Sequence, residues 1–215
     1  LPALSLGLAL LAGCGLPPDE ASTPAPASAP PAPAVSVSAE PPASVAPASA
    51  SPSPSVAATP AATATPAPRP PMPKELLIPA IHVDAPVEHV ATTPDGAMEA
   101  PHDWNDVAWF EPGYRPGEKG GAVIAGHLDS TTDRAVFWDL RLLKPGDTVQ
   151  LKAADGSQRV FQVVGSETYP FDKAPIPKIF GPAEQPMLNL VTCDGTFDRG
   201  SKNYNQRLVV YTREV

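Results

Sequence analysis

The chain has 215 residues, with 15 lysines and arginines against 23 aspartates and glutamates, and its formal net charge is −8 at pH 7. No basic stripe is present, which argues against a surface for nucleic acid or anionic lipid. No Cys-x-x-Cys or His-Glu-x-x-His spacing occurs, and His82, His89 and His102 lie apart in sequence. We therefore predict neither a zinc site nor a cofactor.

The first sixteen residues are apolar and uncharged and contain Leu11-Ala12-Gly13-Cys14. This stretch resembles the lipobox of bacterial lipoproteins, in which the cysteine is lipidated and becomes the mature N-terminus. The alternative is the remnant of a membrane anchor in which Cys14 has no role, because a span needs about 20 apolar residues. Both interpretations of residues 1–16 place the following chain outside the cytoplasmic membrane and tether it there.

Residues 17–73 consist almost entirely of Pro, Ala, Ser, Thr and Val, and they include no aromatic residue. Such a segment cannot bury enough apolar surface to offset the entropy of ordering it. Its prolines favour an extended polyproline conformation. We predict a disordered tether over 17–73 and a single folded domain over 74–215.

The folded part consists of short runs rich in β-branched and aromatic residues, separated by turn sequences such as Pro94-Asp95-Gly96 and Pro145-Gly146-Asp147. We predict strands over 76–79, 107–110, 122–125, 148–152, 160–164, 188–192 and 208–212. This spacing favours an all-β barrel or sandwich over βαβ units. Asp155-Gly156 is the best hairpin turn, and residues 134–142 are the best candidate for a short helix.

Two apolar runs end in chemically competent side chains, one at His127 and one at Cys193. Imidazole and thiol together make a Cys-His nucleophile, and Arg207 could stabilise charge that develops beside them. Each residue also has a structural interpretation: a histidine in a turn, a buried cysteine and a surface arginine. Asp129 could orient His127.

Five stretches, in their order along the chain, resemble the sortases, which are cysteine transpeptidases of bacterial cell surfaces. They are Ile78-Pro79-Ala80-Ile81-His82-Val83-Asp84-Ala85-Pro86-Val87, Pro116-Gly117-Glu118 before Ala122-Val123-Ile124-Ala125-Gly126-His127, Phe137 to Leu140 leading into Leu143-Lys144-Pro145-Gly146-Asp147, Leu190-Val191-Thr192-Cys193, and Arg207-Leu208-Val209-Val210-Tyr211. Their details are most similar to the actinobacterial class F, with class E next. The resemblance covers essentially all of residues 74–215.

The resemblance implies a closed eight-stranded β-barrel with one or two short helices. It places Cys193 at the family's nucleophile, His127 at its essential histidine and Arg207 at its essential arginine, and we expect the three to meet at one mouth of the barrel. The family's Thr-Leu-x-Thr-Cys motif begins here with Asn189 in place of Thr. We expect this change to affect packing or hydrogen bonding rather than the chemistry.

The implied activity is cleavage of a C-terminal sorting signal of the LPxTG type through a Cys193 thioester. The acyl group then passes to an amine from peptidoglycan or a pilin lysine, outside the membrane. The connection 165–186 is expected to wall the peptide groove. Two alternatives stay open: a thiol hydrolase that uses water as acceptor, and a non-catalytic surface-tethered binding module. The acidic residues Asp129, Asp194 and Asp198 could bind calcium, although they lack EF-hand spacing.

Overall fold

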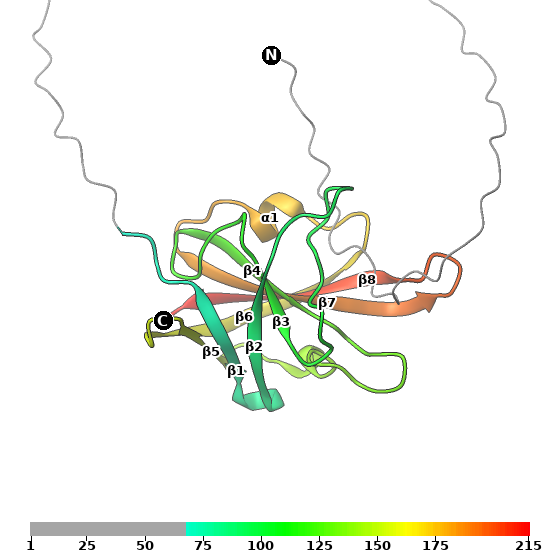
Figure 1. Ribbon diagram of the computed structural model, residues 1–215, viewed down its shortest axis with the longest axis horizontal. Helices are drawn as coiled ribbons and strands as arrows, with labels where there is room; N and C mark the ends of the chain where they lie inside the picture. The colour runs from blue at the N-terminus through cyan, green and yellow to red at the C-terminus, as the bar shows by residue number, and fades with distance from the viewer. Residues whose placement is uncertain (1–67) are drawn as a thin grey trace, which may run out of the picture. The chain divides into compact units, whose positions relative to one another are not determined.

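The computed structural model describes residues 68–215, and within them eight strands close into one barrel (Figure 1). The order around the barrel is β1-β2-β3-β4-β7-β8-β6-β5. The lipobox, Cys14 and nearly all of the predicted tether lie outside the described residues. The elements are β1 (Pro73–Ile78), the 3₁₀ turn η1 (Pro79–Ile81), β2 (Val83–Val90), β3 (Val107–Phe110), β4 (Gly120–Gly126), the 3₁₀ turn η2 (Leu140–Leu142), β5 (Thr148–Ala153), β6 (Gln158–Pro170), α1 (Ile176–Phe180), β7 (Pro186–Asp198) and β8 (Asn203–Glu214). The predicted closed eight-stranded barrel with one or two short helices is confirmed.

Alternation along the strands produces two apolar clusters. Side chains from all eight strands fill the barrel interior, among them Ile124, Leu190 and Val210. The neighbouring positions on β4, β7 and β8 point to the outer face, where Val191 and other residues pack with α1. Because β7 is buried on both faces from Leu188 to Cys193, its sequence there is mostly apolar rather than alternating, and its two polar side chains, Asn189 and Thr192, are hydrogen-bonded.

Most neighbouring strands are antiparallel, but β2 pairs with β3 and β4 pairs with β7 in parallel. The β2–β3 pair requires a long crossover, residues 91–106, which returns the chain to the starting end. The β4–β7 pair joins the two apolar runs whose ends carry His127 and Cys193, although more than 60 residues separate them in sequence. The barrel topology therefore brings the predicted chemical groups onto adjacent strands.

The predicted hairpin at Asp155-Gly156 is confirmed, since it connects β5 to β6 and Gly156 has φ +84°. The predicted helix over 134–142 is wrong, and only Leu140–Leu142 form a 3₁₀ turn there. The reason is that the amides of Ala135 and Phe137 donate to the carbonyls of Leu128 and His127. This bonding attaches the chain to the end of β4, and residues 136–139 form turns rather than a helix.

The long connection predicted over 165–186 is shorter than expected. Strand β6 continues through Pro170 and pairs with β8, after a register shift between Val163 and Gly165. Only residues 171–185 connect β6 to β7, and they contain α1. At the other end of the domain, contacts begin before Lys74, because Arg69 forms an ion pair with Glu118.

Candidate active site

Strands β7 and β8 place Cys193 directly opposite Arg207 in their antiparallel register. Both residues have 0% of their surface exposed. The expectation that a strand ends at Cys193 is wrong, because β7 continues to Asp198 and β8 returns beside it, so that the pair extends past the rest of the barrel (Figure 1). Gly195, with φ +83°, lies within the irregular stretch of pairing between Asp194 and Phe197.

His127 follows the last residue of β4, and its level on the barrel is set by the parallel pairing of Ala125 with Val191. Two further residues along each strand bring His127 level with Cys193. The Thr192 hydroxyl donates to the Gly126 carbonyl at 2.8 Å and fixes the two strands at this point. Three adjacent strands, β4, β7 and β8, therefore carry the three predicted residues at one level.

Strand alternation places the three residues on the outer face of the sheet, where β4 ends. Each of them is two residues along the chain from Ala125, Val191 or Val209, so by strand alternation it points to the same face as these members of the outer apolar cluster. The barrel interior is filled by the alternate positions. A site on the outer face is open to loops from both sides of β7, whereas the packed interior has no room for a peptide.

His127 is 6% exposed and is held by the crossover between β2 and β3. Its Nε2 donates to the Pro101 carbonyl at 2.9 Å, and its ring centroid lies 4.4 Å from that of Trp104. Burial lowers the pKa of His127, while the bond to Pro101 and the charge of Glu88 raise it to a smaller extent. Because a carbonyl only accepts, Nε2 carries a proton in both charge states of the ring.

The Arg207 guanidinium is bound by residues at the start of its own strand, β8. Nη1 donates to the carbonyls of Tyr204 at 3.0 Å and Gln206 at 2.8 Å, and Nη2 donates to Asn203 Oδ1 at 2.8 Å. The guanidinium carbon lies 5.8 Å from the ring centroid of Phe171. Burial lowers the pKa of Arg207 to about 10, which still leaves the side chain charged at neutral pH.

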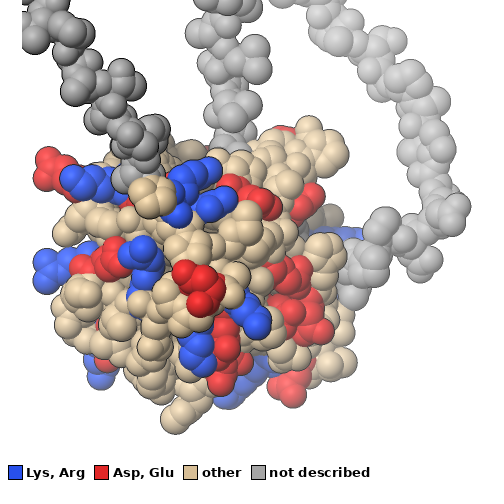
Figure 2. Space-filling model, turned by 60° about the vertical axis from the view of Figure 1, so that its left-hand side comes forward, with Lys and Arg blue, Asp and Glu red and all other residues tan. Residues whose placement is uncertain are grey.

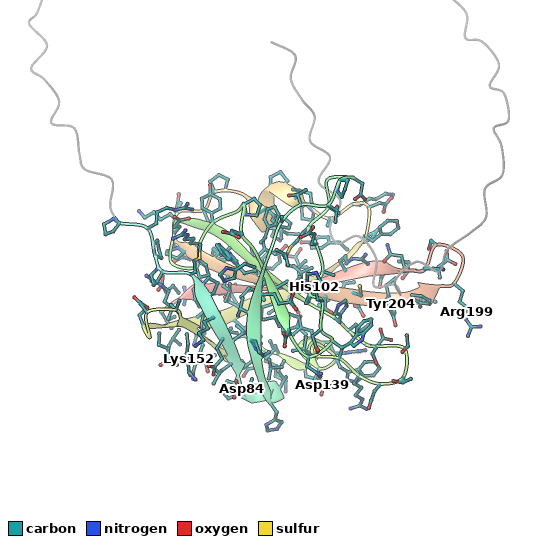
Figure 3. The ribbon with its side chains drawn as sticks, viewed as in Figure 1. Asp84, His102, Asp139, Lys152, Arg199 and Tyr204 are labelled. Carbon is teal, nitrogen blue, oxygen red and sulfur yellow. The ribbon has the colours of Figure 1, made fainter. Side chains whose placement is uncertain are left out.

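Tyr204 connects the arginine side of the site to the segment after His127. Its hydroxyl donates to the Asp129 carboxylate, and its carbonyl accepts from Arg207. Burial, followed by the bond to Asp129, raises the pKa of Tyr204 to about 12. Figure 3 shows Tyr204 partway along the β7–β8 hairpin and Arg199 at its outer end. Asp129 makes no hydrogen bond to His127 in the described part of the chain, so its influence on the imidazole is electrostatic.

Asn189 has the hydrogen-bonding role expected of it. Its Nδ2 donates to the Ile179 carbonyl in α1 at 2.6 Å. The amide of Gly121 donates to the Gly181 carbonyl at 2.9 Å, just after the same helix. A Cβ on Gly121 would lie 2.3 Å from the Ile179 carbonyl oxygen. These contacts hold α1 closely against β4 and β7, upstream of the predicted site.

The connection between β6 and β7 borders two different surfaces. Phe171 is 41% exposed and lies beside Arg207, whereas Ile179 is fully buried and packs in the outer cluster. A cavity of about 710 Å³ lies farther along β8, with Glu167, Lys178 and Tyr211 in its lining. None of the three predicted residues lines this cavity.

The calcium site considered for Asp129, Asp194 and Asp198 is not formed. Within residues 68–215, no group of three or more His, Cys, Asp or Glu side chains is placed to hold a metal ion. Asp194 accepts from Thr168, and Asp198 accepts from the turn that follows it.

On the face seen in Figure 2, basic and acidic side chains are interspersed. None of the helices between residues 68 and 215 has the length and apolar character of a membrane span.

Comparison with known proteins agrees with this architecture. A model of the sortase domain family matches residues 76–215. Sortase C-1 from Actinomyces oris is similar with a TM-score of 0.52 and 20% identity, over 66% of this chain and 72% of that one. Sortase A from Corynebacterium diphtheriae is similar with a TM-score of 0.52 and 19% identity, over 70% of this chain and 63% of that one, less than two thirds of its length. No curated protein sequence matches the chain.

Fold and site together define a β-barrel with a cysteine, a histidine and an arginine on adjacent strands. The family match covers more than half of the chain, and the chain belongs to the sortase family. Three surrounding residues, Glu88, Trp104 and Tyr204, were not identified from sequence. Their contacts to the site pass through backbone groups or ring stacking, which leave no spacing signal.

Proposed function

We propose that this protein is a cysteine transpeptidase of the sortase type, most similar to class F and next to class E. The observation that carries the proposal is the common level of His127, Cys193 and Arg207 on β4, β7 and β8 of a sortase-family barrel. The substrate is an exported protein that ends in an LPxTG-like sorting signal. Cys193 is the nucleophile, and the chemistry requires no organic cofactor.

In the first half-reaction the Cys193 thiolate attacks the carbonyl carbon of the scissile Thr-Gly bond. The carbon–nitrogen bond breaks, a thioester forms, and the His127 imidazolium gives a proton to the departing amine. Because Nε2 is held by the Pro101 carbonyl, Nδ1 is the ring nitrogen that exchanges this proton. Burial lowers the pKa of His127, which makes the ring a stronger acid toward the amine.

In the second half-reaction an incoming amine attacks the thioester, and His127, now neutral, accepts the proton that the amine loses. A new amide bond forms, and the Cys193 thiolate departs. Arg207 holds the developing oxyanion or orients the substrate backbone. Its contacts to Asn203, Tyr204 and Gln206 fix the planar guanidinium before substrate arrives, so little reorganisation is needed.

The acceptor amine is a cell-wall peptide or a pilin lysine, and the reaction takes place outside the cytoplasmic membrane. This placement rests on the sequence of residues 1–16, where either lipidation at Cys14 or a membrane anchor would hold the enzyme, and on the proline-rich segment 17–73 as a tether. To distinguish lipidation from a plain anchor, the amount of the chain in released and membrane-bound fractions is compared between cells that express the unmodified chain and cells that express Cys14→Ala. Loss of the variant from the membrane fraction would favour lipidation.

The test of the function is product partition with the full chain under reducing conditions. An LPxTG-type peptide is supplied with and without triglycine, and the products are separated by chromatography. We expect a triglycine ligation product that Cys193→Ala does not form. Hydrolysis that triglycine leaves unchanged would favour a thiol hydrolase, and peptide binding without cleavage would favour a binding module.

A further inference from the structure

Glu88 on β2 is bound to the crossover segment that holds His127. Its carboxylate accepts from the His102 amide at 3.0 Å and 3.2 Å, and from the Asp103 amide at 3.3 Å. It also accepts from His102 Nδ1 at 2.6 Å. The Glu88 side chain is 21% exposed. One partly buried carboxylate therefore fixes two successive amides of a segment that has no regular secondary structure.

The peptide group between Pro101 and His102 lies between Glu88 and His127. Its N–H donates to Glu88, and its carbonyl accepts from His127 Nε2 at 2.9 Å. The described residues contain no cis peptide bond, so this N–H and carbonyl point in opposite directions. The carboxylate and the imidazole are thus connected in series through a single planar group, although 39 positions separate them in sequence.

This arrangement has two physical consequences. A carboxylate that accepts from the N–H polarises the peptide group, so the carbonyl oxygen becomes a stronger acceptor for the imidazole N–H. The rigid peptide also fixes the direction of that acceptor, and the Trp104 ring restricts the imidazole from the side. Both effects favour the ring orientation with Nε2 on Pro101 and Nδ1 toward the reaction, and both stabilise the imidazolium form.

We propose that Glu88 is a positioning residue for His127 and acts through the peptide group between Pro101 and His102. It has the function that a carboxylate in direct contact with the histidine has in other nucleophilic triads, with one peptide group inserted between the two side chains. The proposal rests on the proposed function, since it assigns a partner to the proposed general acid. Asp129, the other carboxylate considered for this role, is bound to Tyr204 instead.

The charged groups around His127 come from several elements. Glu88 lies on β2, Asp103 on the crossover and Asp129 after β4, and all three raise the pKa of His127, with Glu88 contributing most among the charges. Cys193 on β7 and Arg207 on β8 lie opposite each other on the neighbouring strands. His102 is exposed, and its pKa is raised by Glu88, so protonation of His102 at low pH partly neutralises the Glu88 charge.

The test replaces Glu88 with glutamine, which keeps the size of the side chain and removes its charge. The titration of His127 is followed by NMR in the free protein, and peptide turnover is measured in parallel. We expect His127 in Glu88→Gln to titrate at lower pH than in the unmodified protein. We also expect kcat to fall about tenfold with little change in KM, the order of effect of losing a carboxylate partner behind a functional histidine.

The matched control is Glu99→Gln, because Glu99 lies on the same crossover and accepts from a backbone amide, that of Ala91, at 3.0 Å. His127 should titrate in this variant as in the unmodified protein. An unchanged or raised titration midpoint in Glu88→Gln would overturn the proposal, whatever the activity. Absence of transpeptidation in the unmodified protein would instead contradict the proposed function and leave the titration result to decide the role of Glu88.

A second measurement covers the case in which Glu88→Gln does not fold. In the unmodified protein, the ¹⁵N shifts of His127 report which nitrogen is protonated in the neutral ring. Protonation at Nε2, together with a His127 midpoint in Glu88→Asp below that of the unmodified protein, supports the proposal. Protonation at Nδ1 would overturn it, because the Pro101 carbonyl could then receive no hydrogen bond.

Discussion

Replacing Arg207 with lysine separates the charge of the guanidinium from its planar shape. The lysine keeps a positive charge but cannot reproduce the two Nη atoms that donate to Asn203, Tyr204 and Gln206. Because Arg207 is fully buried and its acceptors are partly buried, the loss of these hydrogen bonds should cost about 1–3 kcal/mol of folding free energy. The loss of a fixed oxyanion donor should lower kcat by about 10²-fold, which corresponds to about 2.7 kcal/mol.

The assay for Arg207→Lys is steady-state cleavage of a fluorescence-quenched LPxTG-type peptide, with thermal unfolding measured on the same samples. The matched control is Arg213→Lys, since Arg213 lies on the same strand and is exposed. The control should retain full turnover. Turnover of Arg207→Lys within about twofold of the unmodified protein, in a folded sample, would show that the planar fork is not needed and would refute the assignment.

Three further predictions concern pH, the helix contact and the tyrosine. Burial lowers the pKa of His127, so the folded state loses stability relative to the unfolded chain as pH falls below about 6.5. The drop in Tm between pH 7.5 and 5.5 should therefore be smaller in His127→Asn than in the unmodified protein. An equal drop in the two proteins would contradict this. Gly121→Ala, whose Cβ would meet the Ile179 carbonyl, should raise the peptide KM by displacing α1, while Gly165→Ala, with open space around its Cβ, should not. Tyr204→Phe should lower the free energy of unfolding by about 1 kcal/mol in chemical denaturation, because a partly buried hydroxyl–carboxylate bond is lost. No change would show that Asp129 finds water instead.

Most of the fold could be predicted because its strands are apolar runs bounded by turns. Strand β2 was missed for a specific reason: Pro86 and the charged Asp84 and Glu88 interrupt a run whose buried positions, Val83 and Ala85, alternate normally. Proline is tolerated there at a position that needs no ladder N–H. The continuation of β7 past Cys193 was missed because Asp194-Gly195 is typical of a turn, whereas here Gly195 takes a positive φ within the strand pair.

The sequence selects the residues of the proposed site but not their surroundings. His127, Cys193 and Arg207 could be selected because each adjoins an apolar run and matches a family motif. The face they occupy could not, since it depends on the register between β4 and β7, which joins positions 66 residues apart. Glu88 and Trp104 lie near His127 only because of the way the crossover folds. The hydrogen bond from His127 goes to the backbone carbonyl of Pro101, which any residue type could supply, so it leaves no signal in the sequence. Ile179, within the connection expected to wall a groove, is instead a core residue on the buried face of α1.

Intact-protein mass spectrometry after brief mixing of the reduced full chain with an LPxTG-type peptide tests the central claim most directly. The account predicts a mass increase equal to the acyl half of the peptide, located on Cys193 by digestion, and its disappearance when triglycine is added. It also predicts less adduct in His127→Asn and in Arg207→Lys than in the unmodified protein. Cleavage of the peptide without any acyl group on Cys193 would contradict it.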